Sequence, residues 1–377
     1  MKEPLRDLRV GIVGASIAGL TAAHALAVRG ARVQLFERSL HLAERGGSGI
    51  MLDAEVAGAI GGLATRSHVL RRVLGARLQT LWRRPLRKQA TTWGELYRCL
   101  RLRVPDELIH NGCSVKACQL DGTLILQDGS EQVFDLTAGA DGLGSTVRQS
   151  LQPDFEPQYC GYVAIRGMCV SDRWPARGEV VNVYGRNCHA VLYHPAGPLL
   201  NWMCYCNAPD PSELMVDSQG VRHRWSLPPD EVSRDLRDRL VELVKPHLPE
   251  EVVGLVSDTP GIYLQAIYHG LPQSFGQGKV ALVGDAAHVS PPHLGSATSI
   301  AYADVESLAK ALGQGEPMEK WGRDRREEVM AQIEIAYTLG QQLQTGGRDW
   351  DNWEEERFDC WWREVTGGKP LYFDLPG

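Results

Sequence analysis

The chain has 377 residues, of which 43% are hydrophobic and 23% are charged, and its formal net charge at pH 7 is −6. This composition is typical of a globular protein large enough for two domains, and the acidic balance argues against nucleic acid or an anionic membrane as the main partner. We expect no signal peptide, and the sequence has no apolar run of about 18 residues, so we expect a cytoplasmic protein without integral membrane association. The 9 cysteines have no CxxC or His-pair spacing, which indicates reduced thiols and predicts no bound metal.

The first predicted elements are a strand over Val10–Val13, a helix over Ile17–Arg29 and a second strand over Ala31–Phe36. This order is a strand-helix-strand unit, the connection that parallel strands require. The turn between the strand and the helix, GASIAG, matches the dinucleotide fingerprint with a serine in place of the middle glycine. A helix that begins at such a turn points its backbone amides and the positive end of its dipole at a pyrophosphate.

Single residues of this unit have predicted roles in holding a dinucleotide. Gly14 permits the tight turn, and Gly19 lets the helix approach the strand. Ser16 places a Cβ where the backbone and the phosphate come closest, so the match is imperfect. Glu37, at the end of the second strand, is placed to accept hydrogen bonds from an adenosine ribose. The alternative is an ordinary α/β turn that contains glycines for structural reasons alone.

The next segments have less regular patterns. A glycine-rich loop at Gly46–Gly49 leads into a helix, and such a loop either turns tightly or brings the backbone close to a flat ligand. Ser67–Thr92 predicts two short strands rich in arginine. The stretch TTWGELYRCLRL predicts a short helix capped by Thr91 or Thr92.

Strand patterns dominate the following part of the chain. Three strand-like runs separated by Asp-Gly turns lead to GADGLGSTVRQSL, a second strand end that carries an acid, Asp141. Alternating runs in meander order over Tyr159–His269 predict an antiparallel sheet. The stretch PPDEVSRDLRDRLVELVKPHL predicts a helix with a proline and acidic start. In KVALVGDAAH a third strand ends in an acid, Asp285, and two long helical segments follow.

Three motifs together carry a family resemblance. GASIAGL…FERS, GADGLGSTVR and VALVGDAAHVSPPHLG, in this order and spacing, resemble the single-component FAD-dependent aromatic hydroxylases, the group that includes p-hydroxybenzoate and salicylate hydroxylases. More narrowly, GASIAGLTAA and YCGYVAIRG are similar to the 2,6-dihydroxypyridine hydroxylase branch. The resemblance covers nearly the whole chain. It implies a p-hydroxybenzoate hydroxylase-like α/β fold, in which a Rossmann-like FAD-binding domain carries an inserted antiparallel-sheet substrate domain and a helical C-terminal tail.

The fold that the resemblance implies divides the chain into discontinuous domains. We expect residues 1–66, 93–155 and 272–345 to form the FAD-binding domain. Residues 67–92 and 156–271 then form the substrate domain, and residues 346–377 the tail. A homodimer is compatible with this organisation.

The resemblance also assigns cofactor contacts. It implies that Asp285 accepts hydrogen bonds from the ribityl hydroxyls of FAD, and that Pro292 begins a loop that turns helix amides toward the flavin ring. The family pattern Pro-x-x-Gly-x-Gly-x-Asn-x-Ala-x-x-Asp occurs in register, with Ala297 and Ser299 in place of its second glycine and asparagine. The predicted cofactor-binding residues are Gly14, Ser16, Ile17, Ala18, Gly19, Glu37, Arg38, Gly49, Arg98, Asp141, Gly284, Asp285, Pro292, Gly295, Ser296 and Ala297.

Three further positions have alternative interpretations. Arg148 belongs to a motif that the family uses for flavin and nicotinamide contacts, and its alternative role is to fix the strand-to-helix turn. His288 is interpreted as mainly structural. The family's pyrophosphate-binding arginine starts the helix that corresponds to Trp93–Leu100, where this chain has no arginine and Arg98 is only a neighbour.

The implied reaction is an oxygen insertion. NADH or NADPH reduces FAD once a small hydroxylated aromatic or N-heteroaromatic substrate is bound, reduced flavin traps molecular oxygen as a hydroperoxide, and the electron-rich ring attacks the distal oxygen. The protein would supply a dry cavity under the antiparallel sheet and a base that ionises a ring hydroxyl. Candidates for this cavity, each with a packing role as its alternative, are Arg166, His189, Tyr193, Asn201, Met203 and Tyr205. The predicted catalytic residues are Pro292, His189, Tyr193 and Arg166.

Other functions share the same cofactor domain. A flavin-dependent reductase or dehydrogenase without oxygen insertion is the enzymatic alternative, and a flavin- or nucleotide-sensing module is the non-enzymatic one. A halogenase is disfavoured because the chain lacks a Trp-x-Trp-x-Ile-Pro motif. The family's common tryptophan before Arg-Gly is Ile165 here, so no single member's substrate transfers to this chain.

Overall fold

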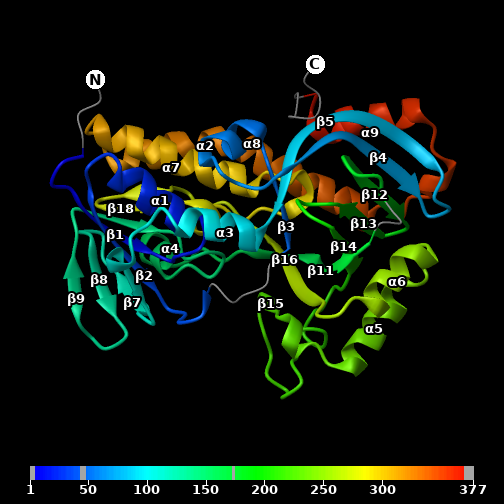
Figure 1. Cartoon of the computed structure of the whole chain (residues 1–377), viewed down its shortest axis with the longest axis horizontal. Coiled ribbons are helices and arrows are strands. Elements are labelled where there is room, and N and C mark those ends of the chain that lie inside the picture. Colours follow the sequence, from blue (N-terminus) through cyan, green and yellow to red (C-terminus); the bar gives the residue numbers. More distant parts are fainter. Residues whose placement is uncertain (1–4, 43–47, 172–174, 369–377) are drawn as a thin grey trace.

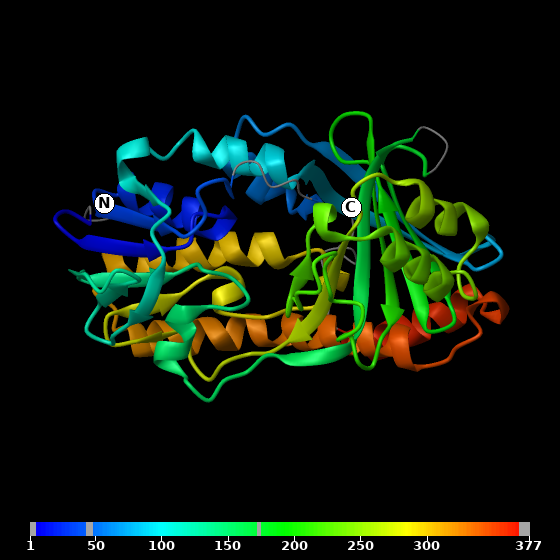
Figure 2. The ribbon, with the colours of Figure 1, turned by 90° about the horizontal axis from the view of Figure 1, so that it is seen from below.

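Two β-sheets lie next to each other along the long axis of the molecule, and one long helix, α8 (Met318–Thr345), packs on both (Figures 1 and 2). The computed structural model describes residues 5–42, 48–171 and 175–368. Within these ranges, none of the helices combines the length and the apolar composition needed to cross a membrane.

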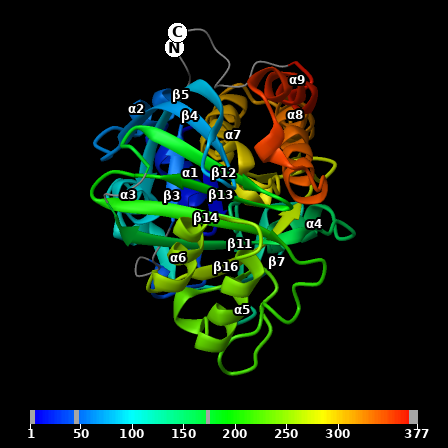
Figure 3. The same ribbon diagram turned by 90° about the vertical axis from the view of Figure 1, so that its right-hand side faces the viewer.

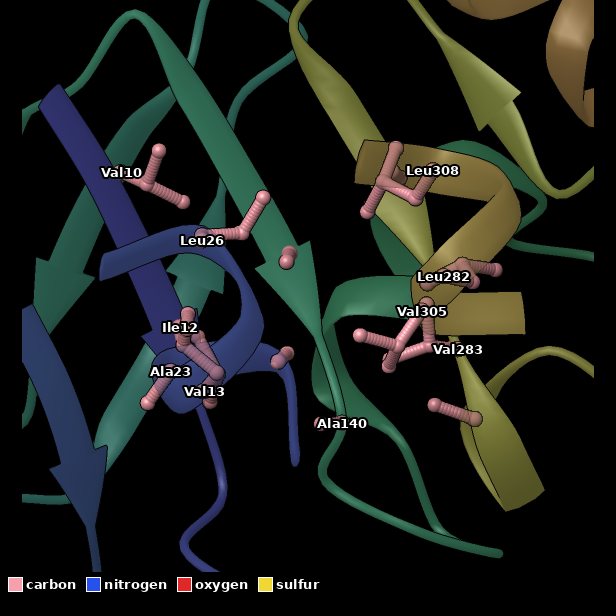
Figure 4. Close-up of a cluster of buried hydrophobic side chains, with 14 of the residues drawn as sticks. Val10, Ile12, Val13, Ala23, Leu26, Ala140, Leu282, Val283, Val305 and Leu308 are labelled. Carbon is pink, nitrogen blue, oxygen red and sulfur yellow. The ribbon is translucent and has the colours of Figure 1, made fainter. Parts of the chain in front are cut away.

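The first sheet is the predicted nucleotide-binding sheet. Its order is β17-β18-β10-β1-β2-β6, and all neighbours are parallel except β17 and β18. Helices α1 and α7 contact each other over it, and apolar side chains from β1, α1, β18 and α7 form its core (Figure 4). Its strands are β1 (Arg9–Val13), β2 (Arg32–Glu37), β6 (Ile109–Asn111), β10 (Leu136–Gly139), β17 (Gly276–Gln277) and β18 (Val280–Leu282), and the helices of this half are α1 (Ile17–Ala27), α3 (Trp93–Arg101), α4 (Thr146–Leu151) and α7 (Ala297–Gly313).

A small antiparallel sheet confirms the predicted Asp-Gly turns. Strands β7 (Val115–Cys118), β8 (Thr123–Leu126) and β9 (Glu131–Val133) pair in order, and the turns between them place Gly122 at φ +90° and Gly129 at φ +84°. Glycine adopts this left-handed backbone at little cost, which is why these turns require it.

The second sheet is the predicted antiparallel one. Its order is β15-β16-β11-β14-β13-β12-β4-β5-β3, with a single parallel pair, β12 and β4. Alternating residues of its strands face two different cores, one against α5 and α6 and the other against α8 and α9. Figure 3 shows these two pairs of helices on different sides of the sheet. Its elements are β3 (Gly49–Leu52), β4 (Arg66–Gly75), β5 (Thr80–Thr92), β11 (Gln158–Val170), β12 (Glu179–Gly185), β13 (Cys188–Tyr193), β14 (Leu199–Asn207), β15 (Ser226–Leu227), β16 (Tyr263–His269), α5 (Arg234–Val244) and α6 (Glu250–Asp258).

Three local predictions were wrong. The arginine-rich strands are not short, because β4 and β5 have 10 and 13 residues and pair as one long hairpin. The loop after the first unit leads into β3 before the helix α2 (Ala54–Ile60) begins. The helix expected to start with prolines begins at Arg234, where the Ser233 side chain accepts a hydrogen bond from Leu236 N, while the prolines lie in a separate 3-10 turn.

The C-terminal segment packs closely on the second sheet. Helix α9 (Glu355–Thr366) follows a short turn, Trp350–Asn352, and its aromatic side chains contact Trp82 of β5 and Tyr184 of β12. The indole Nε1 of Trp82 also donates to Asp359 at 2.7 Å. This aromatic cluster holds α9, and with it α8, against the sheet.

Candidate flavin and substrate site

Four acidic or glycine turns meet at one edge of the parallel sheet. Strands β2, β1, β10 and β18 are neighbours and run in the same direction, so the residues that follow them lie together. These residues are Gly14, Asp141 and Asp285, with Glu37 closing β2. We call this set the carboxyl edge. Ligands of open α/β sheets bind at this side, where the strand order reverses.

The fingerprint turn has the close packing that it needs to approach a phosphate. Gly14 has φ +97°, and a Cβ there would lie 2.5 Å from the carbonyl oxygen of Ala140. A Cβ on Gly19 would lie 1.8 Å from the carbonyl oxygen of Gly14. Ser16 is the N-cap of α1 and its side chain makes no capping hydrogen bond, so the amides of the first turn, at Ile17 and Ala18, keep their donors for a ligand.

Glu37 holds the fingerprint turn in place. Its Oε2 accepts a hydrogen bond from Ala15 N at 2.9 Å, and its Oε1 accepts one from Ser39 N at 2.8 Å. Each carboxylate oxygen has a second lone pair, so the predicted contact with a ribose is compatible with these bonds. Arg38 is exposed beside it.

Asp285 is the carboxylate of this edge that is open to a ligand. Its side chain is exposed, and among the described residues none donates a hydrogen bond to it. It follows Gly284, which has φ +61° and where a Cβ would lie 2.9 Å from the Cβ of Ala18. The end of β18 therefore touches the N-terminus of α1, as one ligand bound by both would require.

Asp141 and Arg148 have structural contacts here. The Asp141 carboxylate accepts hydrogen bonds from Ser145 Oγ at 2.5 Å and Thr146 N at 2.7 Å, and so caps α4. The buried Arg148 donates to the carbonyl oxygens of Asp285 and Ala286 at 3.2 and 3.0 Å. Arg148 therefore fixes the turn that presents Asp285, in keeping with its alternative role.

His288 lies in a buried network at the same turn. Asp304 Oδ2 accepts hydrogen bonds from Gly284 N at 2.9 Å and His288 Nε2 at 3.0 Å, and Asp304 Oδ1 accepts one from Arg325 Nε at 2.8 Å. Burial opposes ionisation of Asp304, but these partners outweigh it and hold its pKa below the usual range. The network joins the β18 turn to α7 and α8, which agrees with a structural interpretation of His288.

The Pro292 loop connects this edge to the second sheet. Pro292–Leu294 forms a 3-10 turn, Gly295 follows with φ +58°, and α7 begins at Ala297. The N-cap, Ser296, makes no side-chain capping bond, so the first amides of α7 are open to a ligand. In place of the family asparagine, Ser299 Oγ accepts a hydrogen bond from the backbone N of Asp53 at 3.1 Å.

A cavity of about 180 Å³ lies between the Pro292 loop and the second sheet. We call it the inter-sheet cavity. The predicted residues that line it are Gly49, Arg166, His189, Tyr193, Met203, Tyr205, Pro292, Gly295, Ser296 and Ala297. Residues of four different strands, of the Pro292 loop and of the start of α7 thus meet in one space.

Asn201 has another role than the predicted one. It does not belong to the residues that line the cavity; its Oδ1 accepts a hydrogen bond from Gly49 N at 2.6 Å and so ties β3 to β14. A Cβ on Gly49 would lie 2.8 Å from both Asn201 and the Tyr193 hydroxyl. Gly46 and Gly47, predicted with Gly49 as a loop near the ligand, lie outside the described residues.

Arg98 does not reach the carboxyl edge. Its side chain is 59% exposed and pairs with Glu95 one turn earlier on α3, at 2.8 Å. At the start of this helix the Trp93 ring stacks on Tyr97, with centroids 4.8 Å apart. The contact predicted for Arg98 therefore has no geometric support.

Several cavity residues were missed from the sequence. Arg71 and Asn182 come from β4 and β12, and the Arg71 Nη2 donates to the Asn182 Oδ1 at 3.2 Å. His293 lies in the Pro292 loop, and Leu339 and Leu343 reach the cavity from α8. The arginine-rich pattern of β4 was visible, but only the pairing of β4 with β12 places one of its arginines here.

The two cavity histidines are neutral. Burial, with His293 and Arg71 nearby, holds the pKa of His189 well below its usual range. Burial, with Arg71 and Arg166 nearby, lowers the pKa of His293 to about 3. Burial disfavours the charge on Arg166 as well, but the hydroxyls of Tyr263 and Tyr205 outweigh it and raise the pKa. The cavity is therefore cationic through its arginines alone.

These features fit a flavin dinucleotide. The fingerprint turn and α1 would hold the pyrophosphate, Glu37 the ribose, Asp285 the ribityl chain, and the α7 amides the ring beside the cavity. An unpartnered carboxylate and two helix N-termini with open amides lie at or next to the carboxyl edge, beside glycines that lack space for a Cβ. An extended ligand requires such a set of groups.

Comparison with known protein families also indicates binding of a flavin and a nicotinamide nucleotide. Residues 12–49 match a family described as an NAD(P)-binding Rossmann-like domain, and residues 159–269 match one described as FAD binding domain-like. The second match covers β11 to β16, in the second sheet.

Two curated relatives match most of the chain. The 3-amino-4-hydroxybenzoate 2-monooxygenase of Streptomyces cremeus is 28% identical over 81% of this chain and 79% of its own length. The 2,6-dihydroxypyridine 3-monooxygenase of Paenarthrobacter nicotinovorans is 27% identical over 92% of this chain and 94% of its own.

Solved structures share the fold. The 2,6-dihydroxypyridine-3-hydroxylase of Arthrobacter nicotinovorans superposes with a TM-score of 0.82 at 22% identity, covering 90% of this chain and 94% of its own. A salicylate hydroxylase superposes with a TM-score of 0.70 at 18% identity, covering 96% and 97%. The predicted fold and the predicted FAD and nicotinamide cofactors are confirmed, and the chain is similar in sequence and in fold to the FAD-dependent aromatic hydroxylases.

Proposed function

We propose that the chain is a FAD-dependent monooxygenase that hydroxylates a small hydroxylated aromatic or N-heteroaromatic ring, with NADH or NADPH and molecular oxygen as co-substrates. One observation carries this proposal. The Pro292 loop both lines the inter-sheet cavity and opens α7, so a flavin ring held by the α7 amides would border the space where a small ring fits. A homodimer in the cytoplasm remains a prediction.

FAD would supply the redox chemistry, passing electrons from the nicotinamide to oxygen and one oxygen atom to the ring. The chain's own residues would orient the substrate and keep water out. Leu86, Val180, Val191 and Leu294 contribute apolar lining, and Tyr205 stacks on His189 with ring centroids 4.6 Å apart. A flat apolar ring fits such walls, and exclusion of water protects a reactive oxygen species from side reactions.

The charge of the inter-sheet cavity limits the substrate class. Arg71 and Arg166 line it, and no described lining residue is Asp or Glu. Such a space favours a ring that carries negative charge, either an ionised hydroxyl or a carboxylate, because charge-assisted hydrogen bonds to arginine are strong. An ionised hydroxyl also makes the ring electron-rich, as hydroxylation requires.

The test is turnover with isotopically labelled oxygen gas. FAD-loaded protein is mixed with NADH or NADPH alone and with 2,6-dihydroxypyridine, 3-amino-4-hydroxybenzoate or salicylate. We expect slow nicotinamide oxidation alone, strong acceleration by at least one ring, and one labelled oxygen atom in its product. Unlabelled product, or turnover that is unchanged without oxygen, would instead support a reductase.

A matched pair of variants tests the cationic cavity. Arg166→Gln removes a buried lining charge, and we expect it to raise the KM for an anionic ring at least tenfold. Arg222→Gln removes an exposed arginine remote from the cavity lining and should leave the KM unchanged. Equal KM values for the two variants would remove Arg166 from substrate binding.

A further inference from the structure

His189 is held by a side chain from a distant helix. The Nε2 of Gln344, in the last turn of α8, lies 2.8 Å from the Nδ1 of His189 on β13. Both side chains are 1% exposed. A buried contact between an amide and an imidazole has one donor and one acceptor, so its direction decides which nitrogen of the ring carries the proton.

The backbone settles the direction of this contact. The same Nε2 of Gln344 lies 3.3 Å from the carbonyl oxygen of Tyr205. A carbonyl oxygen only accepts, so the amide atom between Tyr205 and His189 must be the NH2 group. One of its hydrogens goes to the carbonyl and the other to the imidazole. The opposite orientation of the amide would place its oxygen against the Tyr205 carbonyl. The Nδ1 of His189 therefore accepts and carries no proton.

The second ring nitrogen of His189 is left for a ligand. Because the imidazole is neutral and its Nδ1 accepts, its single proton lies on Nε2. This Nε2 is buried and has no hydrogen-bond partner among the described residues. His189 lines the inter-sheet cavity, and its ring is stacked on Tyr205 with an interplanar angle of 15°, which keeps it from turning away.

We propose that Gln344 is a positioning residue that holds His189 as the Nε2–H tautomer, so that His189 donates a hydrogen bond to an acceptor atom of the substrate and does not act as a base. The substrate part of this inference rests on the proposed function, whereas the tautomer does not. The sequence offered His189 only as a candidate catalytic residue beside an unidentified base. The geometry makes it a donor.

This assignment narrows the substrate. The ring atom or substituent that meets His189 must accept a hydrogen bond, as a carbonyl, a carboxylate, an ionised hydroxyl or a bare ring nitrogen does. A ring that presents an N–H or O–H donor there would leave two buried donors facing each other. Sites built to hydrogen-bond one group reject analogues that leave it unpaired. An acceptor at this position is also consistent with the cationic arginines in the same cavity.

The test is the tautomer itself, read by ¹⁵N magnetic resonance of histidine-labelled, FAD-loaded protein. A protonated and an unprotonated ring nitrogen differ in shift, and the His189 signals are those lost in His189→Asn. In the wild type we expect a protonated Nε2 and an unprotonated Nδ1. In Gln344→Glu, a carboxylate can only accept, so Nδ1 should become protonated. A wild-type Nδ1–H, or a Gln344→Glu spectrum like that of the wild type, overturns the proposal.

Gln342→Glu is the matched control. It makes the same substitution two residues earlier on α8, where the side chain bonds Arg348 and a carboxylate is tolerated, and it should leave the His189 signals unchanged. If Gln344→Glu does not fold, Gln344→Met removes the donor without adding charge and should give a mixture of tautomers. A pure Nε2–H signal in that variant also overturns the proposal. None of these spectra requires turnover. A failed oxygen-labelling test would therefore contradict the proposed function and leave the tautomer of His189 to be decided by the spectra alone.

Discussion

The carboxyl edge and the inter-sheet cavity are adjacent but built differently. At the edge, most contacts come from residues at or shortly after the ends of parallel strands, and the groups available to a ligand are mainly backbone amides beside closely packed glycines. In the cavity, side chains from β4, β11, β13, β14, the Pro292 loop and α8 meet across the second sheet. The edge depends on backbone shape, and the cavity depends on which side chains are brought together.

This difference predicts which changes each region tolerates. At the edge, Ser16 and Ala297 depart from the family pattern without disturbing the turn, because their backbone amides are still available. In the cavity, His189, Gln344 and Tyr205 depend on one another through specific atoms, so one side chain can redirect a hydrogen bond. The following variants separate the two regions, from the largest expected effect to the smallest.

Asp285→Ala should give the largest effect, an almost colourless protein. The variant removes an exposed carboxylate to which no described residue donates a hydrogen bond. We assign this carboxylate to the ribityl chain of FAD. The flavin content of the purified protein, from its absorbance, is the measurement. Asp154→Ala, at another exposed acid, is the control and should retain its colour. Full flavin content in Asp285→Ala would remove this residue from the site.

Gly14→Val should weaken FAD binding severely, because the side chain meets the Ala140 carbonyl and Gly14 has φ +97°. The backbone strain alone costs about 1–3 kcal/mol, and the clash adds to it. Gly129→Val, at φ +84° with open space around it, carries the strain without the clash. Ser16→Gly should leave the FAD affinity unchanged. Titration of the apoprotein with FAD measures all three, and equal affinities in Gly14→Val and Gly129→Val would show that the clash is unimportant.

Asp304→Asn should destabilise the protein by about 3–5 kcal/mol near pH 7, because it leaves the buried His288 and the partly buried Arg325 without their carboxylate. The folded pKa of Asp304 lies below its unfolded value of about 3.9, so its contribution is present above that pH and is lost as the pH falls through the folded pKa. Denaturant unfolding at pH 7 and in acid measures this, and the difference from the wild type should shrink in acid. A difference that is independent of pH would contradict it.

Gly340→Ala and Gly58→Ala should give small effects of opposite sign. A Cβ on Gly340 would lie 2.4 Å from the Tyr162 hydroxyl and 2.6 Å from His293 Nε2. Because this overpacks the contact between α8 and the cavity, we expect Gly340→Ala to lower the free energy of unfolding by about 1–3 kcal/mol. Gly58 in α2 has nothing within 4 Å, and alanine there should stabilise the helix by about 0.5–1 kcal/mol. Thermal unfolding compares the two variants. Stabilisation by both would mean that α8 adjusts to the added methyl group.

The sequence by itself determined the carboxyl edge in nearly all its parts. The fingerprint, the acids after three strands and the Pro292 loop could be predicted because the residues within each of these motifs are neighbours in the chain. Parallel strands then align their carboxyl ends, so three local motifs converge without any knowledge of side-chain packing. Arg98 is the exception, since a helix position alone does not say which face meets the ligand.

Only the tertiary structure decided the inter-sheet cavity. The period of two along β11, β13 and β14 predicted Arg166, His189 and Tyr205 as candidates, but not Arg71, which arrives through the parallel pairing of β4 with β12. Gln344 stands more than a hundred residues from His189, at a helix end where no motif marks it. Pairing between distant strands and the docking of α8 set these contacts, and neither strand pairing nor helix docking leaves a local pattern in the sequence.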